Sequence, residues 1–143
     1  MTEPAPAKRR VLLCYDGSEE SKRALERVAE IAGSVAVEVT VVSVAEPLYH
    51  ERPYSRLADP AEEQEHRRLL DAAAADLKSR GVEAETLEPV GEPGEAIVEA
   101  AKQLGAGLVV VGWRHHRLIQ RLLFGSVTGE VVDDAPGDVL VVR

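Results

Sequence analysis

The stretch that organises this chain is GWRHHRLIQRLLFGS, which runs from Gly112 to Ser126. It follows an apolar run at residues 108–111 and precedes a segment with helical periodicity. A buried strand, a loop flanked by glycines and a Gly-Ser start to a helix can together bind an anion, because free backbone N–H groups at a helix start attract negative charge. The stretch also concentrates positive charge in three arginines: Arg114, Arg117 and Arg121. It is therefore a candidate site for a small anion.

The composition favours a single domain with an aliphatic core. The chain has 143 residues, of which 45% are apolar, 29% charged and only 3% aromatic. This length suits one domain with its own core and is short for two. Because aromatic residues are scarce, Val, Leu, Ile and Ala must fill the interior, which favours a sheet covered by helices. We expect residues 1–8 to form a flexible arm and residues 9–143 to form the domain.

Charge and apolar patterning exclude several classes of partner. A formal net charge of −8 repels nucleic acid, and the local arginines suit a small anion better than a polyanion. No apolar run approaches the roughly 18 residues of a membrane span, and the polar, proline-bearing N-terminus does not resemble a signal peptide. The single cysteine, Cys14, lies in an apolar run, where a thiol is usually buried and inert. We predict a cytoplasmic protein that binds neither nucleic acid nor membranes.

Elements of two kinds alternate along the chain. Apolar or β-branched runs predict five strands, at residues 10–15, 35–44, 82–90, 107–111 and 138–142. Amphipathic segments predict four helices between them, at residues 18–33, 60–81, 96–104 and 126–134. Ser18 suits an N-cap, Pro60 a first helical position and Gly81 a helix end. In the last helix we expect Val131 and Val132 to face the core, together with Val127.

This alternation predicts the topology. Strands separated by helices at this spacing imply right-handed βαβ crossovers and a parallel sheet. We expect an α/β fold in three layers, with a doubly wound sheet of five strands in the order 3-2-1-4-5. Ligands of such sheets bind at the carboxyl ends of the strands, where the winding direction reverses. The reversal falls between strands one and four, so Asp16 and Gly112 are expected to face each other across a crevice.

The chain resembles the universal stress protein family over nearly its whole length. The resemblance rests on the opening LCYDGS at 13–18, the turn GEP at 91–93, and the ending GSVT at 125–128 with the terminal VLVV. ATP-binding members of that family carry a glycine, two residues, a second glycine, nine residues and then Gly-Ser or Gly-Thr. Here Gly112 matches the first glycine and the pair at 125–126 matches the last, with the spacing intact. His115 replaces the second glycine.

The resemblance implies a stress-response regulatory protein that binds an adenine nucleotide (ATP, ADP or AMP) with no or slow turnover. It implies that Asp16 holds ribose or adenine and that Val44 lines the adenine slot. The implied residues around the phosphates are Gly112, Arg114, His115, Gly125, Ser126 and Val127. Mg²⁺ would enter only with bound nucleotide, and no other metal site is predicted. The resemblance also implies a homodimer through the last strand, Asp138–Val142, whose exposed edge needs a partner.

Position 115 leaves two interpretations of the site open. A glycine there permits positive φ and close approach of the backbone to phosphate, whereas His115 adds a Cβ and a ring. The ring can donate a hydrogen bond to phosphate, and Arg114 and Arg117 add charge beside it. Retained nucleotide binding is the favoured hypothesis. The alternative is a dimeric interaction module of the same fold that binds no nucleotide.

Several of these residues also have simpler explanations. Asp16 suits ordinary turn chemistry, Gly125 suits packing, and Ser126 suits an N-cap. Glu62 and His66 lie four positions apart on one helix face, which a surface pair explains. No P-loop or nucleophile elbow appears, and no general base is placed beside the expected phosphates. We therefore predict that the protein is not an enzyme, with slow ATP hydrolysis left open.

Overall fold

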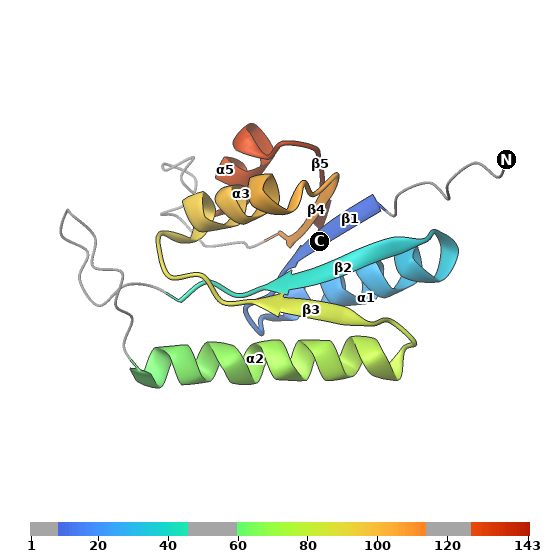
Figure 1. Cartoon of the computed structure of the whole chain (residues 1–143), viewed down its shortest axis with the longest axis horizontal. Helices are drawn as coiled ribbons and strands as arrows, with labels where there is room; N and C mark the ends of the chain where they lie inside the picture. The colour runs from blue at the N-terminus through green and yellow to red at the C-terminus, as the bar shows by residue number, and fades with distance from the viewer. Residues whose placement is uncertain (1–8, 46–59, 114–126) are drawn as a thin grey trace, which may run out of the picture.

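The structure is a computed structural model that describes residues 9–45, 60–113 and 127–143. Within these residues lies a five-stranded parallel sheet with the order β3-β2-β1-β4-β5 (Figure 1). Its strands are β1 (Arg9–Cys14), β2 (Val37–Val42), β3 (Ala84–Leu87), β4 (Leu108–Gly112) and β5 (Asp138–Val142). The predicted fold class and strand order are confirmed.

Helices cover both faces of the sheet. The described helices are α1 (Glu19–Ser34), α2 (Pro60–Ser79), α3 (Pro93–Leu104) and α5 (Val127–Asp134). Helices α1 and α2 lie on one face, and α3 and α5 lie on the other (Figure 1). Each central strand is therefore buried on both sides, which explains its nearly continuous apolar sequence. This arrangement gives the three layers expected from the sequence.

Alternate residues of each strand pack into two separate aliphatic cores. Leu13 and Val41 point to the α1/α2 side, where they pack with Leu25 and Leu77. The opposite core contains residues from β1, β2, β4, α3 and α5: Leu12, Cys14, Val42, Val109, Val111, Ile97, Val98 and Val131. The two cores hold the sheet between the helix layers.

Local signals place the helix ends. The hydroxyl of Ser18 accepts a hydrogen bond from the backbone N–H of Ser21 at 3.2 Å, so Ser18 caps α1 as predicted. Helix α2 begins at Pro60, also as predicted. Helix α3 begins at Pro93, before the expected start at residue 96, because the side chain of Glu92 caps it. It ends at Leu104, and its C-cap Gly105 has a φ of 64°, in the left-handed region.

Some predicted bounds were too wide. The strand expected at 35–44 spans Val37–Val42, because Val35 caps the end of α1 by donating its N–H to the carbonyl of Ile31. The strand expected at 82–90 spans Ala84–Leu87, because the N–H of Val82 instead donates to the carbonyl of Leu77 in α2. In each case a helix end takes the first residue that the apolar pattern assigned to a strand.

The expectation that Val132 faces the core is wrong. Val131 is fully buried, but Val132 is 50% exposed. Adjacent positions on a helix point about 100° apart, so only one of the pair faces the sheet. The expected arm at 1–8 lies outside the described residues. Among the described helices, none is long and apolar enough to cross a membrane.

Candidate functional site

A cavity of about 240 Å³ opens at the carboxyl ends of β1, β2 and β4. Residues of α1, α2, α3 and α5 complete its wall. Asp16, Val44, Gly112 and Val127, four of the predicted site residues, line this cavity. They come from four separate segments of the chain. The cavity lies where the sheet reverses its winding, as expected for a doubly wound fold.

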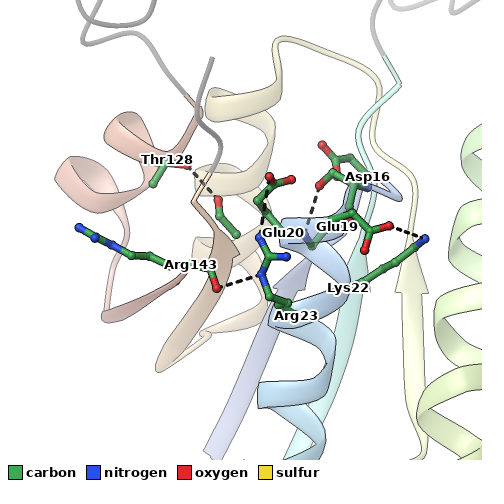
Figure 2. Close-up of polar contacts among 10 residues, drawn as sticks. Asp16, Glu19, Glu20, Lys22, Arg23, Thr128 and Arg143 are labelled. Carbon is green, nitrogen blue, oxygen red and sulfur yellow. Dashed lines mark hydrogen bonds and ion pairs between the residues drawn. The ribbon is translucent and has the colours of Figure 1, made fainter. Parts of the chain in front are cut away.

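Asp16 belongs to a tight turn between β1 and α1. One of its carboxylate oxygens accepts the backbone N–H of Ser18 at 2.9 Å (Figure 2). The turn needs Gly17, because its φ of 81° is a conformation that side chains disfavour. This turn holds the carboxylate at the start of α1, where the helix dipole favours negative charge. Asp16 itself is exposed, which is compatible with a role in ligand contact.

Gly112 ends β4 on the opposite side of the winding reversal. A Cβ at this position would lie 2.7 Å from the backbone carbonyl carbon of Glu20 in α1, closer than atoms can approach. The carbonyl of Gly112 accepts a hydrogen bond of 3.3 Å from the hydroxyl of Thr128 in α5 (Figure 2). Close packing of β4 on α1 therefore requires this glycine, independently of any ligand.

A polar network ties the end of the chain to α1 beside this wall. The Nε of Arg23 donates to the carbonyl of Arg143 at 3.0 Å, and its guanidinium lies 3.9 Å from the carboxylate of Glu20 (Figure 2). The guanidinium of Arg143 lies over the ring of Trp113, 5.7 Å from its centroid. These contacts fix the strand ends of β4 and β5 on α1.

The wall formed by β2 and α2 contains a chain of polar side chains that the sequence did not single out as a site. The hydroxyl of Ser43 lies 2.6 Å from Nδ1 of His66. Nε2 of the same ring lies 3.6 Å from the carboxylate of Glu62. All three residues line the cavity, and Ser43 is 2% exposed. The pair Glu62 and His66 is therefore part of the cavity wall as well as an i, i+4 pair on the helix.

Cys14, the last residue of β1, lines the cavity with an unreactive side chain. Burial, with a smaller effect from the charge of Asp16, raises the pKa of Cys14 to about 12. Its thiol therefore stays protonated at neutral pH, and a neutral thiol is a poor nucleophile. The predicted burial of Cys14 is confirmed. The thiol packs as a small apolar group beside the polar turn.

Three carboxylates crowd together where α3 meets α5. Oxygens of Glu92, Glu95 and Glu130 lie within 4.8 Å of one another. Burial raises the pKa of Glu130, and the charges of Glu92 and Glu95 raise it further. Glu92 also accepts the N–H of Glu95 at 2.9 Å as the cap of α3. Carboxylates of this kind are the ligands that hard divalent cations prefer, but the capping contact explains the position of Glu92 without a cation.

The remaining predicted site residues lie outside the described residues. They belong to the stretch that was expected to surround the phosphates: Arg114, His115, Gly125 and Ser126. The replacement of glycine by His115 therefore remains a sequence-based hypothesis. Gly112, Val127 and Thr128, which lie close to this stretch in the sequence, line the cavity.

Comparison with known proteins agrees with this architecture. A universal stress protein of Thermus aquaticus is 35% identical over 138 residues, which cover 93% of this chain and 97% of the relative. A universal stress protein solved in complex with cAMP has a TM-score of 0.74 and is 29% identical, with 96% and 98% of the two chains covered. The universal stress protein of Archaeoglobus fulgidus in complex with dAMP has a TM-score of 0.76 at 25% identity, with the same coverage.

A family model covers almost the whole chain as well. The model described as the universal stress protein family matches residues 8–143, which include every described strand and helix. Together with the Thermus relative and the two solved structures, this match establishes the assignment that LCYDGS and the glycine spacing suggested. The chain belongs to the universal stress protein family.

Proposed function

We propose that this protein binds an adenine nucleotide in the 240 Å³ cavity and acts as a stress-response regulator with no or slow turnover. The observation that carries the proposal is the convergence of Asp16, Val44, Gly112 and Val127 on one cavity. They come from four segments that are far apart in the sequence, and each matches a position that the family resemblance implies for the nucleotide site. Solved family members in complex with cAMP and dAMP support the class of ligand.

Each wall of the cavity has a proposed role. The Asp16 carboxylate accepts ribose hydroxyls or an adenine donor, and Val44 lies against the base. Gly112 and Val127 border the phosphates, together with Arg114, His115, Gly125 and Ser126 from outside the described residues. ATP and AMP are both candidate ligands, and Mg²⁺ enters only with a bound nucleotide, because phosphate oxygens supply much of its coordination.

We also propose that the working form is a cytoplasmic homodimer formed through β5. In the described residues β5 pairs only with β4, so one edge of the strand is open. Val139, Leu140 and Val141 are only partly buried, and Trp113, whose N–H donates to the carbonyl of Val142, is 37% exposed. An open, apolar strand edge is stabilised by pairing with a second strand. Sedimentation equilibrium of the protein tests this part of the proposal, and a monomer at micromolar concentration contradicts it.

Isothermal titration calorimetry with AMP and ATP tests the nucleotide proposal. We expect micromolar binding of at least one of them, and Asp16→Arg should weaken it at least tenfold, or about 1.4 kcal/mol. The arginine removes an acceptor and introduces bulk at the cavity wall. Asp71→Arg is the matched control, since it makes the same charge change at an exposed position of α2. It should leave the affinity unchanged.

The calorimetry also separates the two functional hypotheses. Absence of heat with both nucleotides at high protein concentration contradicts nucleotide binding and favours the interaction module. His115→Gly then tests the altered family position. Binding that appears only in this variant identifies the histidine as an obstacle, whereas weaker binding identifies it as a ligand contact.

A further inference from the structure

Two hydroxyl groups that line the cavity donate their protons within the protein itself. The hydroxyl of Ser21 donates to the carbonyl of Ser18 at 2.9 Å. The hydroxyl of Thr128 donates to the carbonyl of Gly112 at 3.3 Å. Both side chains line the cavity and are buried. A hydroxyl has a single proton to donate, so neither offers a donor to a ligand.

The hydroxyl of Ser43, on the wall beside α2, is also engaged within the protein. The carboxylate of Glu62 lies 3.6 Å from Nε2 of His66. Because a carboxylate attracts an N–H group, it favours the tautomer of His66 that carries its proton on Nε2. Nδ1 is then an acceptor, and the Ser43 hydroxyl 2.6 Å away donates its proton to it. In this arrangement the Ser43 hydroxyl donates to His66, and Nε2–H of His66 points to Glu62. Both donors therefore have acceptors within the protein.

The other polar side-chain atoms along this wall act as hydrogen-bond acceptors. The Ser43 oxygen keeps its lone pairs after donating, and an ionised Glu62 accepts hydrogen bonds only. Asp16 is likewise an acceptor at the β1 turn, where it already accepts the N–H of Ser18. Hydrogen-bond donors on a ligand can bond to these acceptors. A carbonyl oxygen of a ligand at the same place would find no donor among these groups and would be repelled by the lone pairs and the negative charge.

We propose that the side chains of Ser43, His66 and Glu62 form a subsite on β2 and α2 that selects bases bearing an exocyclic amino group over bases bearing a carbonyl at that position. This inference rests on the proposed nucleotide function and adds to it residues that determine base specificity. His66 acts as a positioning residue, because it holds the Ser43 hydroxyl and Glu62 in the acceptor arrangement. Glu62 is the group that distinguishes the amino group from the carbonyl.

The pair AMP and IMP tests this subsite, because the two ligands differ in having an amino group or a carbonyl at position 6 of the purine. Calorimetry of the wild-type protein should show at least tenfold tighter binding of AMP. Glu62→Gln should narrow this difference to threefold or less, because its amide can donate a hydrogen bond to the carbonyl. Glu65→Gln is the matched control, since Glu65 is exposed on the same helix and pairs with Arg68. It should keep the wild-type ratio.

Each outcome of these titrations decides the proposal. Equal affinities for AMP and IMP in the wild-type protein overturn the subsite and leave the nucleotide function standing. A tenfold preference that Glu62→Gln leaves unchanged overturns the role of Glu62. Absence of binding by both ligands overturns the nucleotide function and the subsite together. Thermal melting of both variants checks that an altered ratio does not come from loss of the fold.

Discussion

The cavity has two walls that are built in different ways. The wall of β1 and β4 rests on a tight turn and a glycine, in which Asp16 bonds to a residue two positions away and Gly112 permits close packing on α1. The wall of β2 and α2 rests on a contact between Ser43 and His66, which are 23 positions apart. The first wall depends on backbone conformation and space, and the second depends on hydrogen bonds between side chains.

This difference predicts how each wall responds to substitution. A side chain that clashes with the backbone of α1 can be accommodated only if α1 moves away from β4. That movement would also open the close-packed core between them. A lost side-chain hydrogen bond costs less when water or a neighbouring group can replace the partner. We therefore expect substitutions in the β1/β4 wall to affect folding most and those in the β2/α2 wall to affect folding less.

Gly112→Ala is expected to have the largest effect. Its Cβ would lie 2.7 Å from the carbonyl carbon of Glu20, and overpacking of this kind destabilises by about 2–3 kcal/mol. Urea denaturation measures the change. Gly33→Ala is the control, because no atom lies within 4 Å of the new Cβ in α1, and it should stabilise by roughly 0.5–1 kcal/mol. A Gly112→Ala variant as stable as the wild type would contradict the packing argument.

Ser43→Ala tests the other wall and should have an intermediate effect. It removes the partner 2.6 Å from Nδ1 of His66 and should destabilise by about 1–2 kcal/mol, the range for a buried hydrogen bond. Ser79→Ala is the control, since the Ser79 hydroxyl donates to the carbonyl of Asp76 at an exposed position of α2, the helix that carries His66. If both substitutions cost the same, the contact with His66 contributes nothing specific to the wall.

Glu130→Gln is expected to have the smallest effect, and one that depends on pH. The raised pKa of Glu130 means that the folded state holds the proton more tightly than the unfolded state. The stabilisation from protonated Glu130 is complete below its unfolded-state pKa near 4.5. It is lost as the pH rises through the higher pKa of the folded state. A neutral glutamine should therefore raise the melting temperature by about 2 °C at pH 7 and by less at pH 4.

Glu99→Gln in α3 is the control for this pH dependence. Glu99 is exposed and accepts a hydrogen bond from Gln103 at 3.2 Å, so its substitution should not raise the melting temperature at pH 7. Differential scanning calorimetry at the two pH values gives the comparison. An increase that is equal at pH 4 and pH 7 would show that charge crowding by Glu92 and Glu95 is not the cause.

Features that depend on residues adjacent in the sequence could be predicted from the sequence. The cap at Ser18, the helix start at Pro60 and the burial of Cys14 each follow from local sequence, and the structure confirms them. The strand order was also predictable, because alternating strands and helices allow few right-handed topologies. The ends of β2 and β3 were placed less well, since Val35 and Val82 have strand-like side chains but bond to the ends of α1 and α2.

The roles of single residues in the cavity divide in the same way. Asp16 and Gly112 were found from the sequence because each ends a recognisable strand and the topology places strand ends together. Glu62 and His66 gave only an i, i+4 spacing, which is common on helix surfaces. Nothing in the sequence connects that pair with Ser43.

Strand order, the cap at Ser18 and the position of the crevice were thus contained in the sequence, because they follow from periodicity, turn chemistry and the handedness of crossovers. Only the tertiary structure revealed that a Cβ at Gly112 would clash with the backbone of Glu20 and that the hydroxyl of Ser43 forms a hydrogen bond with His66. Both are contacts between segments distant in the chain, and their distances depend on how α1 and α2 pack on the sheet. Packing is a collective property of many side chains, and no local pattern specifies it.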